Sequence, residues 1–144
     1  EGLAAVIGMG GGGIVMGTRF IATKESGFHE NYQNVIPPAK AGDTRLVTGM
    51  LGPIRLWKNK YCMSKELVPN KENLVEIEEM RSPEELLEDW KHYMIILDGE
   101  MEDTAVLMGQ SAGVINSVES LGDMVNTITK GAEECIKKAY ANIK

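Results

Sequence analysis

The stretch from Gly8 to Phe20, with the sequence GMGGGGIVMGTRF, has the residue types and order of a phosphate-binding loop. The apolar triplet Ile14 to Met16 is β-prone and leads into Gly17 and Thr18, a tight turn that can open a short helix. Free backbone N–H groups at the carboxyl end of a strand hold a phosphate group without any cationic side chain. The stretch therefore predicts a phosphorylated cofactor as the ligand.

The glycines from position 8 to position 13 also match the G-x-G-x-x-G pattern of dinucleotide sites. That pattern requires a strand before the glycines and a helix after them. Here residues 2–9 are expected to be helical and residues 14–16 to form a buried parallel strand, so the order is reversed. The glycines are better explained as a structural helix-to-strand connection, with one of them at the helix C-cap.

Other residues that could do chemistry have structural explanations that we favour. His29 has no partner arrangement for acid–base catalysis and is expected to cap a helix or lie at the surface. Cys62 and Cys135 fit no metal or redox spacing and are expected to be free thiols. The acids of one helix are expected to form a solvated face that the helix dipole favours, namely Glu84, Glu85, Glu88 and Asp89.

Composition excludes several classes of protein. The 144 residues are 43% hydrophobic and 25% charged, which is ordinary for a globular domain. A formal net charge of −6 argues against a nucleic-acid surface, and the basic stretch Arg55 to Lys65 is better explained as a solvated face. No apolar run approaches the roughly 18 to 20 residues of a membrane span. No signal peptide is recognisable, so a cytoplasmic location is expected.

Local signals predict the elements that would position these residues. Ser82-Pro83-Glu84-Glu85 is a capping box with proline at N1, which predicts a helix to about Leu97. That helix should bury Leu86, Leu87, Trp90, Tyr93 and Met94. Further helices are expected from His29 to Ile36 and from Ser120 to Ile143, the last with a possible break at Gly131, and strands at 43–48 and 54–57. Asn73 to Glu79 is acidic and amphipathic.

The sequence GLAAVIGMGGGGIVMGTRFIATKES resembles the last helix-strand-loop of a family of FMN-dependent (β/α)8 barrels. The family includes nitronate monooxygenases, formerly 2-nitropropane dioxygenases, and type II enoyl-acyl carrier protein reductases. Its M-G-T loop helps to bind the FMN phosphate, which implies this role for Met16, Gly17 and Thr18. Val15 stands where the family usually has Gln, so the resemblance implies no side-chain contact to the flavin there.

Two later blocks extend the resemblance over essentially the whole chain. Thr48-Gly49, Arg55, Asn59 and Lys60 match the way in which the family leaves the barrel. The block from Gly99 to Ile115 resembles the family's G-D-x-E-D-G-S-x-M-A-G-Q-x-A-G-L-I, except that Thr104 replaces a usual Gly. In the family this segment lies over the active site, which implies that Gln110 and Ser111 line the substrate pocket. The Gln110 amide can instead satisfy a buried carbonyl group.

The resemblance implies an α/β fold, namely the carboxyl-terminal part of a TIM barrel with a helical cover. Residues 1–48 would be the last helix-strand-loop of the barrel, and residues 49–144 a mostly helical segment packed over it. Because a complete barrel takes roughly 250 residues, we expect the amino-terminal half in the same or a separate chain. The implied function is FMN-dependent oxidation or reduction, with NAD(P)H or dioxygen as the redox partner.

The implied substrate is a small molecule or an acyl thioester: an alkyl nitronate oxidised by dioxygen, or a carbon–carbon double bond reduced by NAD(P)H. The second block is slightly closer to the reductase branch. A homo-oligomer is expected, without nucleic acid, membrane or metal partners. The alternative function is a non-catalytic half-barrel that serves as an interaction subunit. An isolated half-barrel would expose sheet edges and apolar faces, so we expect that it does not fold as a lone monomer.

Overall fold

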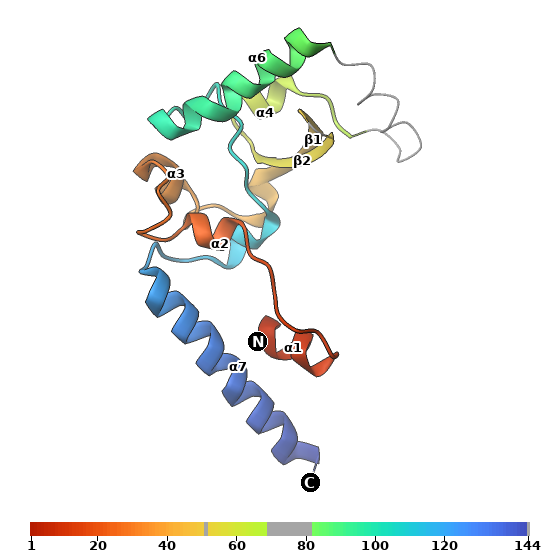
Figure 1. Cartoon of the computed structure of the whole chain (residues 1–144), viewed down its shortest axis with the longest axis vertical. Coiled ribbons are helices and arrows are strands. Elements are labelled where there is room, and N and C mark those ends of the chain that lie inside the picture. The colour runs from red at the N-terminus through yellow and green to blue at the C-terminus, as the bar shows by residue number, and fades with distance from the viewer. Residues whose placement is uncertain (51, 69–81, 144) are drawn as a thin grey trace.

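The computed structural model describes residues 1–50, 52–68 and 82–143 (Figure 1). Within them the elements are α1 (Gly2–Gly8), α2 (Thr18–Ile21), α3 (Glu30–Val35), η1 (Ala41–Asp43), β1 (Thr44–Gly49), β2 (Gly52–Trp57), α4 (Lys60–Ser64), α6 (Pro83–Met94), η3 (Ile95–Asp98), η4 (Gln110–Val114) and α7 (Leu121–Ile143). The amphipathic segment expected from Asn73 to Glu79 lies outside the described residues.

A β-hairpin forms the middle of the structure. β1 and β2 are antiparallel, with Val47 opposite Ile54, which confirms the two predicted strands. Residues 105–108 run antiparallel along the free edge of β2. Trp57 N donates to Val106 O (2.8 Å), and Met108 N donates to Arg55 O (3.2 Å). These bonds fix which way each side chain of the added segment points.

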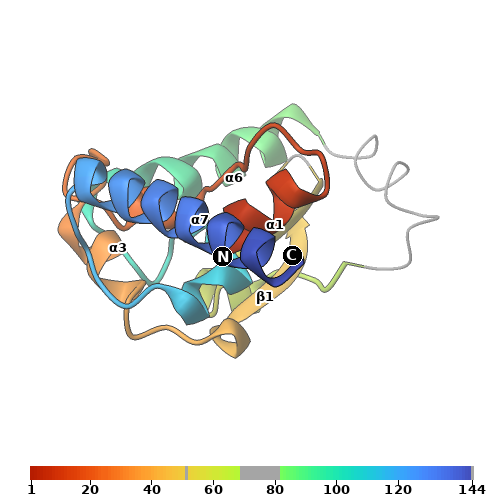
Figure 2. The ribbon, with the colours of Figure 1, turned by 90° about the horizontal axis from the view of Figure 1, so that it is seen from below.

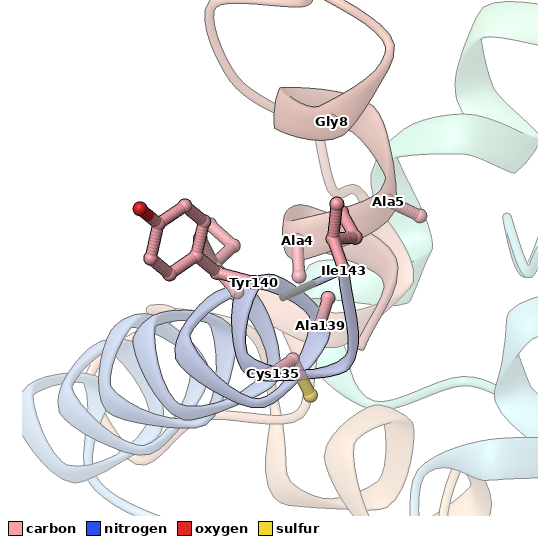
Figure 3. Close-up of a pocket in the computed structure, with 8 residues that line it drawn as sticks. Ala4, Ala5, Gly8, Cys135, Ala139, Tyr140 and Ile143 are labelled. Atoms are coloured by element: carbon pink, nitrogen blue, oxygen red, sulfur yellow. The ribbon is translucent and has the colours of Figure 1, made fainter.

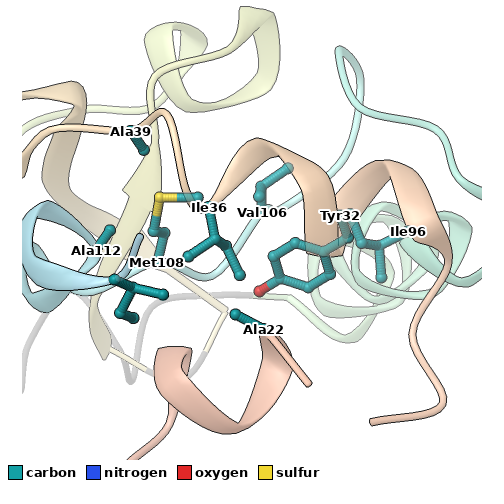
Figure 4. Packing of buried hydrophobic residues seen from close by; sticks show 9 residues of the cluster. Ala22, Tyr32, Ile36, Ala39, Ile96, Val106, Met108 and Ala112 are labelled. Carbon is teal, nitrogen blue, oxygen red and sulfur yellow. The ribbon is translucent and has the colours of Figure 1, made fainter. Parts of the chain in front are cut away.

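The alternation of side chains along this added segment divides the interior into two cores. Val106 and Met108 enter the first core, where they meet α3 through Tyr32 and Ile36 (Figure 4). The Tyr32 hydroxyl group also donates a hydrogen bond to the Leu107 carbonyl group. Ala105 enters the second core, on the side of α4 and α6, whose members are Val47, Leu56, Tyr61 and Cys62. One face of the hairpin is therefore packed in the second core, whereas the other face, which carries Leu46 and Arg55, stays partly exposed.

Helix α6 begins where the capping signals predict. The Ser82 hydroxyl accepts from Glu85 N (3.2 Å), and the Glu85 carboxylate accepts from Ser82 N (2.8 Å). The helix continues into η3 and ends at Gly99, whose positive φ of 83° is a left-handed C-cap that favours glycine. The predicted start and end of this helix are confirmed.

The predicted burial along α6 is partly wrong. Leu87 and Trp90 are 59% and 49% exposed, whereas Asp89, expected on a solvated face, is only 4% exposed. The cause is that α6 turns Asp89 toward α4. There the carboxylate pairs with Lys65 and accepts a hydrogen bond from the Tyr61 hydroxyl (3.0 Å). A buried carboxylate is tolerated because it is paired and hydrogen-bonded.

The predicted strand at Ile14 to Met16 is wrong. The chain from Gly11 to Met16 is extended but unpaired, and Val15 is fully exposed. A strand needs a neighbour, and among the described residues the sheet is the two-stranded hairpin β1–β2, formed by later residues. The fold is thus a mixed α/β arrangement without a barrel strand at this position. The sequence predicted a glycine at the C-cap of α1. In the structure Met9 is the C-cap residue, and Gly10, with a φ of 88°, is the residue directly after it.

Helix α7 forms a rod at one end of the molecule, with α1 beside its C-terminal half (Figures 1 and 2). Its first turn is capped by Ser120, whose hydroxyl accepts from Asp123 N (3.2 Å). The Glu25 carboxylate accepts from Leu121 N (2.8 Å). The helix continues through Gly131, so the possible break there does not occur. No helix in the described part of the chain is long and apolar enough to cross a membrane.

The two cysteines lie in different surroundings. Cys62 is fully buried beside the hairpin, and burial raises the pKa of its thiol. Cys135 is partly exposed on α7, in an apolar groove of about 440 Å³ between α1 and α7 (Figure 3). Because a thiol must be reached by the reagent to react, partial exposure favours reaction of Cys135, and burial disfavours reaction of Cys62.

We therefore expect iodoacetamide to alkylate Cys135 in the native protein and Cys62 only after denaturation. Intact-mass analysis would show one added label before urea treatment and a second after it. Cys135→Ser should remove the native label. Rapid native labelling of Cys62 would contradict the packing of α4 on the hairpin.

Candidate functional site

The loop Met16–Thr18 presents open backbone donors. Gly17 is the N-cap of the four-residue helix α2. In the part of the chain that the structure describes, the amides of Gly17, Thr18 and Arg19 donate to no protein acceptor. A Cβ atom added to Gly17 would meet no other atom within 4 Å, so this side of the loop is open. Open amides beside a glycine suit an anionic ligand.

Thr18 joins this loop to the second predicted block. Its side chain is turned inward, the residue is 7% exposed, and its Oγ1 atom accepts from Gly109 N at 2.9 Å. The two residues are 91 positions apart in the sequence. Gln110 and Ser111 follow directly at the start of η4, and both are exposed. The structure thus brings the predicted cofactor-binding residues and the predicted pocket residues to one place.

A hollow of about 350 Å³ opens where these segments meet the hairpin. Gly17, Thr18 and Gly109 line one part of it, and Arg55 of β2 lines another. Arg55 donates through Nη1 to Thr44 Oγ1 (3.2 Å), and no carboxylate pairs with it among the described residues. An Arg beside open amides makes the hollow suitable for a phosphate group.

Sequence reasoning assigned no binding role to Arg55. The residue was noted only as part of a matching pattern, within a basic stretch explained as a solvated face. A usable signal was its position in the apolar strand Pro53 to Trp57, where it is the only charged residue. A charge in the middle of a half-buried strand indicates a specific partner or ligand.

Gly17 also borders a second hollow, of about 430 Å³, on the side of α7. Its walls are mainly apolar and include Phe20, Phe28 and Leu121. Glu25 lines it as well, but its carboxylate already accepts the hydrogen bond from Leu121 N. The hollow near Arg55 also has mainly apolar walls, but it contains a guanidinium group without a carboxylate partner among the described residues, so it is the better match to an anionic ligand.

His29 does not belong to this site. Its Nδ1 atom accepts from Asn31 N (3.2 Å) at the start of α3, so the predicted capping role is confirmed. The described residues also contain no group of three or more His, Cys, Asp or Glu that could hold a metal ion. The polar groups that the described residues bring to the hollow are backbone amides, the Thr18 hydroxyl group and the Arg55 guanidinium group.

Asn59 positions the segment that carries Gly109. The residue is 5% exposed and uses its whole amide: Nδ2 donates to Met101 O and Thr104 O (2.7 Å each), and Oδ1 accepts from Cys62 N (2.8 Å). These bonds hold the chain just before it pairs with β2. Asn59 is thus a structural residue that acts on the site from a distance.

A mixed α/β fold in which the loop at Gly17 lies beside the segment at Gly109 is the class of structure that these observations define. The sequence profile of the nitronate monooxygenase family matches residues 1–131, and the chain belongs to this family. No curated protein sequence matches the chain significantly.

Solved structures agree with the family. FabK from Thermotoga maritima superposes with a TM-score of 0.71 and 26% identity, over 98% of this chain and 43% of that chain. A point mutant of the same protein superposes with a TM-score of 0.70 and 26% identity, over 98% of this chain and 40% of that chain. Nitroalkane oxidase from Streptomyces ansochromogenes superposes with a TM-score of 0.62 and 22% identity, over 96% of this chain and 37% of that chain. At this identity the match shows likeness of fold alone. The chain spans about two fifths of the length of these proteins.

We expect Asn59→Ala to lower the free energy of unfolding by about 3 kcal/mol, because it removes three hydrogen bonds and leaves the Met101 carbonyl group and the buried Cys62 amide without this partner, while the Thr104 carbonyl group keeps only Val106 N. Asn59→Asp should be similarly harmful, since it keeps the acceptor for Cys62 but cannot donate to Met101 or Thr104. Urea unfolding of both variants measures this. Asn126→Ala, on the exposed face of α7, is the control and should change stability by less than about 0.5 kcal/mol. An unchanged free energy of unfolding in Asn59→Ala would show that the three hydrogen bonds do not stabilise the fold.

Proposed function

We propose that this chain supplies the phosphate-binding loop and the helical cover of an FMN-dependent oxidoreductase of the nitronate monooxygenase or enoyl reductase II type. The single observation that carries the proposal is the hydrogen bond between Thr18 and Gly109, because it unites the two blocks that resemble the family. Membership of the nitronate monooxygenase family supports the class of chemistry.

The residues present fit the phosphate of FMN. The open amides of the Met16, Gly17 and Thr18 loop would bind its oxygen atoms, and Arg55 would add a positive charge from β2. When bound, FMN supplies the redox chemistry, and the protein positions it and excludes water. Gln110 and Ser111 would line the substrate pocket, offering an amide and a hydroxyl group to a small molecule or an acyl thioester.

The remaining part of the barrel is the partner that the exposed segments require. Met9 and Val15 are 80% and 101% exposed, and α1 contains no buried residue. Exposed apolar side chains beside an unpaired extended segment suit the edge of a larger sheet. We infer that residues 1–48 complete a barrel whose amino-terminal half lies in the same or a separate chain, and that residues 49–144 cover it. NAD(P)H or dioxygen would be the redox partner, and the assembly a homo-oligomer.

The absorbance spectrum of the purified, undenatured protein tests the proposal directly. Bands near roughly 370 and 450 nm, retained after FMN loading and desalting, are expected for a flavoprotein. Turnover assays with NAD(P)H and with an alkyl nitronate would then separate the two branches. A colourless protein that folds cooperatively and takes up no flavin would overturn the proposal and favour a non-catalytic interaction subunit.

Gly17→Val is expected to leave the fold intact and to weaken FMN binding by about 10-fold or more. A Cβ atom at this position meets no protein atom within 4 Å, but the added side chain stands where a phosphate would approach the backbone. Flavin fluorescence titration measures the affinity for FMN and for riboflavin, which lacks the phosphate and should bind unchanged. Gly12→Val, in the glycine run and also free of contacts, is the matched control. Equal FMN affinity in Gly17→Val and in the original protein would show that this loop does not bind the phosphate.

Arg55→Gln should weaken FMN binding by roughly 10- to 100-fold, the worth of a hydrogen bond to a charged group. The loss should shrink at high salt, because part of the attraction is screened. Riboflavin affinity should change little. Arg45→Gln is the control, since Arg45 points to the other face of the hairpin, where it meets the Met63 sulfur atom (3.5 Å). Equal losses for FMN and riboflavin would assign Arg55 a purely structural role.

A further inference from the structure

Two consecutive residues of α2 bind both ends of one distant segment. Thr18 Oγ1 accepts from Gly109 N just before η4. Arg19 donates through Nη1 to Ser117 O (3.2 Å), and its Nη2 atom pairs with the Glu119 carboxylate after η4. The short helix next to the cofactor loop therefore holds η4 at its entrance and at its exit.

The α2 side of these contacts is largely sheltered from water: Thr18 is 7% exposed and the Arg19 side chain 16% exposed, whereas the Glu119 side chain is 35% exposed. Burial lowers the pKa of the Arg19 guanidinium from its ordinary value, yet an arginine stays charged at neutral pH. Arg19 also donates to Ala22 O (3.0 Å), which ties its side chain to the end of α2. Sheltered polar contacts are costly to break, so η4 should follow any displacement of α2.

The segment that contains η4 is also held by its apolar side: Ala112 and Ile115 lie in the first core, and Lys24 N donates to Glu119 O (3.1 Å). Its polar side chains Gln110 and Ser111, in contrast, are exposed. A Cβ atom at Gly113 would lie 3.0 Å from Ala41 N, so the approach of η4 to Ala41 depends on the absence of a side chain. The side chains of Thr18 and Arg19 thus connect the cofactor loop to the residues on either side of Gln110 and Ser111.

We propose that Thr18 and Arg19 are positioning residues that transmit occupancy of the cofactor loop by a phosphate group to Gln110 and Ser111. The inference rests on the proposed function, because it takes the FMN phosphate as the ligand of Gly17 and Thr18. It assigns the Thr18 side chain to η4, while the backbone amides remain for the ligand. Ordering of the substrate pocket would then depend on a bound phosphorylated cofactor.

Amide hydrogen–deuterium exchange of residues 109–119, read by mass spectrometry on the purified protein, tests this coupling. FMN at about ten times its Kd should slow exchange there about 10-fold, because it stabilises the arrangement in which Thr18 and Arg19 hold both ends of η4. Riboflavin, which lacks the phosphate, should not. Thr18→Ser keeps the acceptor and should behave like the original protein. Thr18→Val should lose the slowing at 109–119 when FMN is added at ten times the Kd measured for that variant.

Thr129→Val, an exposed threonine of α7, is the matched control and should leave the exchange pattern unchanged. If Thr18→Val does not fold, Glu119→Gln tests the other end of η4 by weakening the Arg19 ion pair. FMN binding without slower exchange at 109–119, or equal slowing in Thr18→Val, would overturn the inference and leave the proposed function standing. Absence of FMN binding in the original protein would overturn both.

Discussion

The pairing of residues 105–108 with β2 is the constraint on which the rest of the structure depends. Two backbone hydrogen bonds, from Trp57 to Val106 and from Met108 to Arg55, set the register of this segment. Its alternation then places Val106 and Met108 in the core under α3, and Ala105 in the core under α4 and α6. One short backbone pairing therefore organises both cores.

The same pairing also positions the residues of the candidate site. Asn59 holds the chain before the paired segment, and Thr18 receives it afterwards at Gly109. Between these points the hollow near Arg55 forms against the open amides of the loop. The two separate blocks that resemble the nitronate monooxygenase family thus meet directly, through Thr18 of the first and Gly109 of the second, while Asn59 and β2 hold the second block in place. This explains how a site can depend on a buried asparagine that touches no ligand.

Signals that act over a few residues were predictable from the sequence. The caps at Ser82 and Ser120 and the two hairpin strands appear as expected, because each depends on neighbours in the chain. The strand at Ile14 to Met16 was wrong, since a strand requires a partner from elsewhere. The predicted exposure of Asp89 was wrong for the same kind of reason. Its burial depends on Tyr61 of α4 and on Lys65 directly after α4, which are distant in the sequence.

The site shows the same division. The loop and the Gln110 block were predictable as separate pieces, because each carries its own local pattern. Their contact through Thr18 and Gly109 was not, and neither was the place of Arg55, because both depend on tertiary packing over long sequence distances.

The alternation of residues 105–108 also limits how the chain can change in length. Side chains on a paired segment repeat every two residues, so one inserted or deleted residue between Gly99 and the pairing would exchange the two cores. Val106 and Met108 would then face α4, and Gly109 would no longer lie opposite Thr18. Relatives of this protein should therefore vary in length elsewhere and keep the spacing from the end of η3 to Gly109 constant.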